Sequence, residues 1–122
     1  SNLWSTLKTL PQTAVISLTR HGFNNQGLQE KKRGVVPFPV DALLYMPGHP
    51  DVPFLAVAIQ CHTGTSLTSG HYRALVRASA AKGSEWVVYD DDRVSRMESV
   101  DVRKEEAYIL VYRQLDPRDL VR

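Results

Sequence analysis

A mainly β fold, α+β at most and built on an antiparallel sheet, is predicted by three features of this sequence. Short apolar runs rich in β-branched and aromatic residues recur at residues 13–18, 54–62, 71–78, 86–89 and 107–112, and strands favour these residue types. Glycine and proline pairs separate several of the runs, as turns do. Only residues 99–106 leave room for a short helix. The 122 residues suit a single domain with a modest core.

The first half of the chain predicts one strand followed by loops. Residues 13–18 follow Pro11 and form an apolar run typical of a buried strand. The polar residues 22–34 predict an exposed hairpin or loop that ends in a solvated basic run. Residues 35–39 are expected to be extended, because each proline disfavours the helical region for the residue before it. We expect a single turn at 41–45 and a loop at 47–50.

The second half predicts four strands. Residues 54–62 form a mixed apolar run, and Lys82-Gly83 is expected to turn the strand at 71–78 into the strand at 86–89. Residues 71–78 alternate two sets of side chains, which are Tyr72, Ala74, Val76 and Ala78 on one face and Arg73, Leu75 and Arg77 on the other. Val94 and residues 100–102 predict short extended or turn segments, and residues 107–112 give the strongest strand pattern.

Composition narrows the class of protein. A net charge of +2, from 15 Lys and Arg against 13 Asp and Glu, is too small and too dispersed to indicate a nucleic-acid-binding surface. No apolar run reaches the roughly 18 residues that a membrane span needs, and no signal-peptide pattern is visible. The single cysteine cannot form an internal disulfide, so a reducing compartment is expected. We therefore expect a cytoplasmic or nuclear protein with neither a membrane nor a nucleic acid as its partner.

A histidine and a carboxylate that flank the predicted unit of two strands joined by Lys82-Gly83 are the candidates for chemistry, with His71 at its entry and Asp90 at its exit. A neutral imidazole can take a proton from a thiol or hydroxyl, and a carboxylate can orient that imidazole. If the turn between the two strands were a symmetric two-residue turn, His71 would lie opposite Val94, and Asp90 would be four residues away, about 13 Å along the strand. Spacing alone therefore leaves two interpretations open, a His–Asp pair or a partly buried histidine beside a solvated acidic turn.

Several spaced motifs agree with one known family. They are Thr63-Gly64, Ser69-Gly70-His71-Tyr72, Trp86-Val87-Val88-Tyr89-Asp90-Asp91 and Ala107-Tyr108-Ile109-Leu110-Val111-Tyr112. In this order they closely resemble the C-terminal half of the ubiquitin-specific protease family, within the papain-like cysteine protease superfamily. That family has His-x-Gly, Ser-Gly-His-Tyr, Trp-x-x-(Phe/Tyr)-Asp-Asp and Ala-Tyr-(Ile/Leu)-Leu-x-Tyr there. The resemblance extends upstream to about Leu10, and it implies the sheet of the palm part of such a protease.

The resemblance also implies roles for individual residues. His71 corresponds to the catalytic histidine and Asp90 to the orienting carboxylate, with Asp91 as a second candidate. Residues 63–70 correspond to the loop beside the substrate tail, where small residues let the end of ubiquitin pass close to the backbone. The substrate-binding residues implied are Gly64, Ser69, Gly70 and Tyr72. Trp86, Tyr108 and Tyr112 correspond to core or supporting positions.

The sequence departs from the family pattern in important ways. The Gly-Asn-Thr-Cys-Tyr box that carries the nucleophile is not among these 122 residues, nor are the paired Cys-x-x-Cys motifs of the zinc-binding fingers. The expected Lys-Arg-Phe is Thr19-Arg20-His21. We therefore interpret residues 1–122 as one domain that corresponds to the C-terminal half of such a catalytic domain. No metal site and no cofactor are expected.

Two functions follow as hypotheses from different classes. In the first, the chain is the His/Asp half of a thiol-dependent deubiquitinase, and a Cys-bearing half comes from the rest of the polypeptide or from another chain. In the second, it is an inactive module that binds ubiquitin, a ubiquitin-like protein or another protein, or serves as a structural subunit. Cys61 is expected to be a buried free thiol rather than the nucleophile, so the isolated chain should not turn over ubiquitin substrates. Nucleic-acid binding through residues 31–33 is the least favoured alternative.

Overall fold

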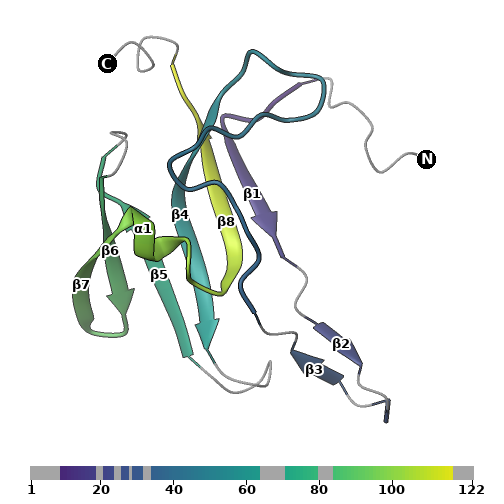
Figure 1. Cartoon of the computed structure of the whole chain (residues 1–122), viewed down its shortest axis with the longest axis vertical. Coiled ribbons are helices and arrows are strands. Elements are labelled where there is room, and N and C mark those ends of the chain that lie inside the picture. Colours follow the sequence, from purple (N-terminus) through teal and green to yellow (C-terminus); the bar gives the residue numbers. More distant parts are fainter. Residues whose placement is uncertain are drawn as a thin grey trace.

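The chain folds around one antiparallel sheet in the computed structural model, which describes residues 9–18, 21–23, 26–27, 29–31, 34–63, 71–79 and 84–116. In these residues the elements are β1 (Thr13–Ser17), β2 (His21–Phe23), β3 (Gln29–Lys31), β4 (Phe54–Thr63), β5 (His71–Arg77), β6 (Glu85–Asp90), β7 (Arg93–Glu98), α1 (Ser99–Val102) and β8 (Ala107–Gln114). Six strands form the main sheet in the order β1-β8-β4-β5-β6-β7, with every neighbouring pair antiparallel (Figure 1). The predicted mainly β, antiparallel fold is confirmed.

β2 and β3 form a separate two-stranded ribbon. His21 pairs with Lys31 and Phe23 with Gln29, and Figure 1 shows the ribbon extending away from the main sheet beyond the end of β1. The hairpin that the polar residues 22–34 predicted is thus confirmed.

One face of the main sheet, which we call the inner face, carries the core. The register aligns the buried side chains of neighbouring strands, so Ile59 lies between Leu75 and Leu110. Residues 34–53 and α1 cover this face and contribute buried side chains of their own, including Val40 and Val102. Burying apolar side chains on one face of a sheet is the main source of stability in such a fold.

Polar atoms fix this cover to the sheet. The Tyr112 hydroxyl donates to the carbonyl of Pro39 at 2.7 Å, and burial raises the pKa of Tyr112 to about 12. The Trp86 indole N–H donates to Ser99 Oγ at 3.0 Å, and the Ser99 hydroxyl donates to the carbonyl of Ser84 at 2.9 Å. Trp86 and Tyr112 are 0% and 1% exposed, which agrees with their predicted core positions.

The opposite face of the sheet, which we call the outer face, presents large apolar side chains to solvent. It includes Val15, Tyr72, Val76, Tyr89 and Val94. Exposed apolar side chains gathered on one face are a common feature of surfaces that meet another protein. Among the described residues, no helix is long and apolar enough to cross a membrane.

The structure confirms each strand predicted at 13–18, 54–62, 71–78, 86–89 and 107–112, with ends shifted by one or two residues. The extended segment expected at Val94 is confirmed as β7, which is longer than expected because it pairs with β6 over six positions. The single turn expected at 41–45 is wrong, since Leu44 forms an antiparallel bridge with Phe54 there. The extended or turn segment expected at 100–102 is also wrong, because these residues belong to α1, inside the segment 99–106 where a helix had room. The turn predicted at Lys82-Gly83 lies outside the described residues.

Candidate active site

His71 and Asp90 lie at the same end of neighbouring strands, and the register between β5 and β6 sets their separation. A symmetric two-residue turn would have left Asp90 four residues out of register with His71. The structure instead pairs Ala74 with Tyr89, so the offset is two residues, or about 7 Å along the strand. Residues offset by two share a face, and such diagonal neighbours are within reach of each other's side chains. The register therefore brings the two side chains together.

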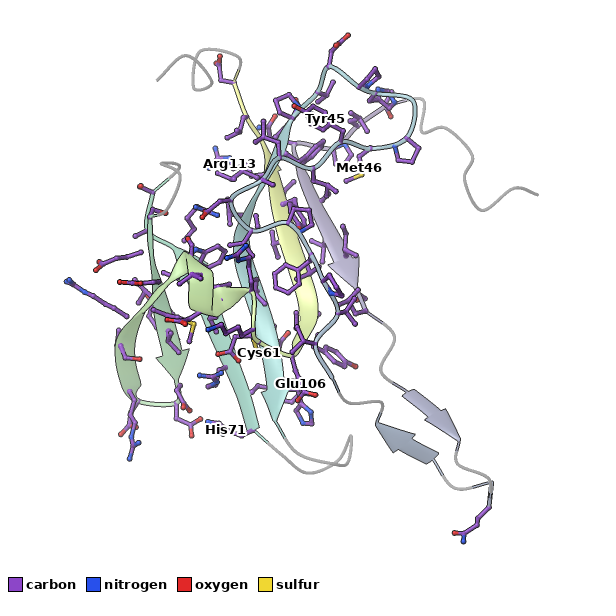
Figure 2. The ribbon with its side chains drawn as sticks, in the orientation of Figure 1. Tyr45, Met46, Cys61, His71, Glu106 and Arg113 are labelled. Atoms are coloured by element: carbon purple, nitrogen blue, oxygen red, sulfur yellow. The ribbon has the colours of Figure 1, made fainter. Side chains whose placement is uncertain are left out.

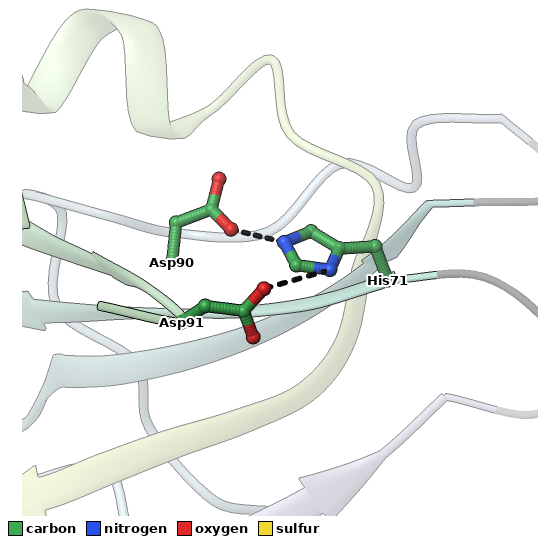
Figure 3. A group of neighbouring side chains, drawn as sticks. All are labelled: His71, Asp90 and Asp91. Atoms are coloured by element: carbon green, nitrogen blue, oxygen red, sulfur yellow. Dashed lines mark hydrogen bonds and ion pairs between the residues drawn. The ribbon is translucent and has the colours of Figure 1, made fainter. Parts of the chain in front are cut away.

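The turn between β6 and β7 places a second carboxylate beside the imidazole. Asp90 pairs with Arg93, so Asp91 and Asp92 form a two-residue loop. Asp91 has a φ of 54°, a left-handed conformation that aspartate tolerates and tight hairpin turns require. Figure 3 shows the result: His71 Nε2 is hydrogen-bonded to Asp90 Oδ1, and His71 Nδ1 lies 3.7 Å from Asp91 Oδ2.

Both carboxylates act on the protonation of His71. The hydrogen bond to Asp90 raises the pKa of His71 above the ordinary value of 6.5, and the negative charges of Asp90 and then Asp91 add to that effect. Partial desolvation and the positive charge of Arg73 oppose it. The side chains of His71 and Asp90 are 41% and 33% exposed, so the imidazole is accessible to another group.

An imidazole bound to a carboxylate through one ring nitrogen can accept a proton through the other. In the described part of the chain, His71, Asp90 and Asp91 are also the one group of three possible metal ligands, with ligand atoms within 4.8 Å of one another. His71 Nε2 is hydrogen-bonded to Asp90, whereas His71 Nδ1 lies 3.7 Å from Asp91 Oδ2, which is longer than a hydrogen bond. The ring thus has one nitrogen bound to a carboxylate and a second that can exchange a proton with another group. The geometry therefore favours proton transfer as the chemistry of this site.

Replacing Asp90 by asparagine should lower the pKa of His71 towards 6.5, because the largest cause of the raised value is removed. A raised histidine pKa stabilises the fold below pH 6.5, and that contribution is lost as the pH rises through the raised value. The Asp90→Asn variant should therefore lose stability relative to the parent mainly below about pH 6.5. NMR titration of the His71 ring and urea unfolding at two pH values measure both effects.

Asp92→Asn is the matched control for that experiment, because it makes the same chemical change in the same turn two residues away. It should leave the titration of His71 nearly unchanged. Equal shifts in the two variants would contradict the assignment of Asp90 as the partner of His71.

A second ion pair lies next to the His71–Asp90 pair and was not predicted from the sequence. The guanidinium of Arg73 donates to Glu105 Oε2 at 2.6 Å, and the two side chains are 21% and 18% exposed. The alternation along β5 already placed Arg73 on the same face as His71. Glu105 gave no sequence signal, because the turn after α1 brings it to β5 from 32 residues away.

Cys61 and His62 have the structural positions that the sequence indicated. Cys61 is a thiol that forms no disulfide, 1% exposed on the inner face, at the position opposite Arg73. Figure 2 labels it towards the end of the sheet where His71 lies. His62 is 2% exposed, with its ring 4.4 Å from that of Tyr72 and 6.5 Å from that of Tyr108. A thiol so deeply buried cannot meet the carbonyl of a protein substrate.

The predicted substrate-binding residues are only partly described. Tyr72 lies on the outer face, 44% exposed and against His62, so its side chain does not join the His71–Asp90 pair on the inner face. Gly64, Ser69 and Gly70 lie outside the described residues. Substrate binding by all four therefore stays a prediction.

Comparison with known proteins connects this geometry to one family. The family profile described as "Ubiquitin carboxyl-terminal hydrolase" matches residues 4–112. Ubiquitin carboxyl-terminal hydrolase 10 of Saccharomyces cerevisiae is 30% identical over 119 residues, which are 95% of this chain and 15% of that protein. Ubiquitin carboxyl-terminal hydrolase 14 of the same yeast is 35% identical over 60 residues, 49% of this chain and 8% of that protein. The chain thus spans a small part of these relatives.

Solved structures agree with the sequence match. The chain is similar to one in a SAGA DUB module bound to monoubiquitin, with a TM-score of 0.76, 30% identity and coverage of 88% of this chain and 24% of that chain. A related module bound to ubiquitin aldehyde gives a TM-score of 0.75 at 29% identity, over 88% of this chain and 25% of that chain. With the profile matched from residue 4 to residue 112, the chain belongs to the ubiquitin carboxyl-terminal hydrolase family.

Proposed function

We propose that this chain carries the histidine and aspartate of a thiol-dependent deubiquitinase that hydrolyses the bond after the C-terminal glycine of ubiquitin. The hydrogen bond between His71 and Asp90 is the observation that carries the proposal. Family membership supports it, as does the similarity to a chain in a module bound to monoubiquitin. We further propose that residues 1–122 are one domain, equivalent to the C-terminal half of the complete catalytic domain.

In the proposed reaction His71 is first a general base and then a general acid. A cysteine from the rest of the polypeptide, or from another chain, loses its proton to the ring nitrogen that does not bind Asp90. The thiolate attacks the carbonyl of the terminal glycine, and the protonated His71 gives its proton to the leaving amine as the carbon–nitrogen bond breaks. His71 then takes a proton from water, and the resulting hydroxide attacks the thioester. The carbon–sulfur bond breaks as His71 returns that proton to the departing thiolate, which regenerates the thiol and the neutral imidazole.

Asp90 supports both halves of this cycle. It holds the ring in one orientation, and its negative charge stabilises the imidazolium that forms each time His71 accepts a proton. Asp91 is less well placed for this role, because it is 3.7 Å from the ring and its side chain is 78% exposed. We therefore assign the orienting role to Asp90 and a weaker, purely electrostatic role to Asp91.

A second candidate function is an inactive module that binds another protein or serves as a structural subunit. The observation in its favour is the outer face, where Val15, Tyr72, Val76, Tyr89 and Val94 are exposed together. Such a module would have no chemical need for the His71–Asp90 bond, and for this reason we prefer the enzymatic proposal. The two functions are distinguished by whether His71 is needed for covalent chemistry.

A ubiquitin probe that ends in a thiol-reactive vinyl group tests the proposal directly. The complete gene product, or the complex that contains it, should be labelled covalently at a cysteine outside this chain. The isolated 122-residue chain should not be labelled, and Cys61→Ala should change nothing in either sample, because that thiol is 1% exposed. Labelling mapped by mass spectrometry to Cys61 would refute the assignment. A complete product that never labels would favour the binding module.

A further inference from the structure

His71, Arg73 and Asp90 share the inner face at the end of β5 and β6. Two of them, His71 and Arg73, can each interact with the carboxylate of Asp90. Arg73 is two residues from His71 on β5, so both side chains point to the same face. The ladder between β5 and β6 ends at the pair of Ala74 and Tyr89. Arg73 and Asp90 are the next residues on the two strands, and the charge of Asp90 acts on the guanidinium. The guanidinium therefore has two carboxylates within its surroundings, Asp90 across the strands and Glu105 after α1. If Arg73 were drawn to Asp90, the guanidinium would neutralise part of the carboxylate charge, and Asp90 would then be a weaker partner for His71.

The structure resolves this competition in favour of Glu105. The guanidinium donates to Glu105 Oε2 at 2.6 Å, a charge-assisted hydrogen bond that is largely shielded from water because the two side chains are 21% and 18% exposed. Asp90 accepts from His71 instead. The hydrogen bond to Glu105 is the largest cause of the raised pKa of Arg73, and the charge of Asp90 adds to it.

Glu105 is held in place by the turn that follows α1. Its backbone N–H donates to the carbonyl of Val102 at 3.1 Å, and Val102 is fully buried in the core. The next residue, Glu106, points elsewhere, and one of its carboxylate oxygens accepts from the backbone N–H of Gly34. Of the two adjacent glutamates, Glu105 is therefore the one that binds the guanidinium of Arg73.

We propose that Glu105 is a positioning residue for the His71–Asp90 pair: by holding the guanidinium of Arg73, it keeps the Asp90 carboxylate available to His71. The pair of Arg73 and Glu105 thereby sets the charge that the imidazole experiences. Only the effect of Glu105 on catalysis rests on the proposed function. The effect of Glu105 on the interaction between Asp90 and His71 can be measured in this chain without any hydrolysis.

The proposal predicts the direction in which each substitution shifts the titration of His71. Glu105→Gln removes the charged partner of Arg73, so the guanidinium should turn to Asp90, and the pKa of His71 should fall by about half a pH unit or more. The double variant Arg73→Gln/Glu105→Gln removes the competing cation as well and should recover most of that loss. The other charged or titratable groups facing this cluster are Asp90 and Asp91 at the β6–β7 turn and Cys61 on β4, and all three are kept.

The test is an NMR titration of the full chain, with the His71 signal assigned from a His71→Gln sample. Glu85→Gln is the matched control, because it breaks the exposed ion pair with Arg96 (3.6 Å) at the opposite end of β6 and changes the net charge equally. A Glu105→Gln titration that coincides with the Glu85→Gln titration would overturn the proposal. The proposal would also be overturned if the pKa of His71 in the double variant Arg73→Gln/Glu105→Gln fell as far as in Glu105→Gln. If Glu105→Gln alone does not fold, the double variant is compared with the parent, and its His71 pKa should lie close to the parent value.

The readout does not depend on hydrolysis, so the two proposals can fail separately. If the complete protein hydrolyses nothing but the titration shifts as described, the enzymatic function fails and the positioning role of Glu105 stands. If hydrolysis needs His71 but Glu105→Gln leaves both the titration and the pH profile of kcat/KM unchanged, Glu105 has only a structural role. In an active protein, we expect the lower limb of that pH profile to move to lower pH in Glu105→Gln and to return in the double variant.

Discussion

Replacing His71 by alanine in the complete protein should reduce kcat/KM for a ubiquitin substrate by on the order of 10³-fold or more. Among the described residues, the imidazole of His71, hydrogen-bonded to Asp90, is the group placed to accept and return a proton. Without it the thiol must ionise unaided, and the leaving amine has no acid. Its side chain is 41% exposed, so little packing is lost and the fold should survive. Steady-state hydrolysis of a ubiquitin–fluorophore amide, with circular dichroism as the folding check, measures both.

His49→Ala is a suitable control, because it removes the same side chain from the loop that leads into β4. It should leave kcat/KM near the parent value. The outcome that would contradict the catalytic assignment is a loss in His71→Ala no larger than that in His49→Ala. For a module that only binds, His71→Ala should leave the affinity for the partner nearly unchanged, whereas a polar substitution on the outer face, such as Tyr89→Ser, should weaken it.

The His71–Asp90 pair illustrates what a sequence can and cannot supply. The motifs identify both residues, but a symmetric two-residue turn would place Asp90 about 13 Å along the strand from the position opposite His71. The actual register differs by two residues, and nothing local in the sequence fixes that difference. A hairpin register depends on the whole set of side chains that the two strands bury together. The pairing was therefore predictable from resemblance and not from spacing.

Alternation along β5 was predicted correctly, but it left open which face meets the core. The face with Tyr72 and Val76 is the more apolar, and yet it is the exposed one, whereas Leu75 and Arg77 are buried. The reason lies far away in the sequence, since residues 34–53 and α1 cover the inner face and supply acceptors for the arginine. Burial of a charged side chain depends on such partners, and they cannot be recognised before the fold is known.

Replacing Arg77 should destabilise the fold far more than replacing an arginine on the surface of the sheet. Its side chain is 1% exposed and lies 3.1 Å from Asp41 Oδ1. The guanidinium also donates to the carbonyls of Ala56 and Val40, and its central carbon lies 4.8 Å from the centroid of the Trp86 ring. These contacts join β5 to β4 and to the segment that covers the inner face.

Arg77→Met keeps much of the side-chain volume, but it leaves the Asp41 carboxylate without its cation and two buried carbonyls without their donor. Breaking a buried pair in this way typically costs about 3–5 kcal/mol of unfolding free energy. The cost here should lie towards the lower end, because the Asp41 side chain is 25% exposed and water can partly solvate it. Adding Asp41→Asn should recover part of the loss, since it removes the uncompensated charge.

Arg96→Met provides the comparison, because Arg96 is 78% exposed and its pair with Glu85 is 3.6 Å long. Exposed pairs of this kind contribute less than about 1 kcal/mol, so this variant should unfold close to the parent urea midpoint. Equal midpoints for Arg77→Met and Arg96→Met would show that the buried guanidinium does not hold the cover to the sheet. A large loss confined to Arg77→Met, partly reversed by Asp41→Asn, would show that a buried charge fixes the segment at residues 40–41 over the inner face.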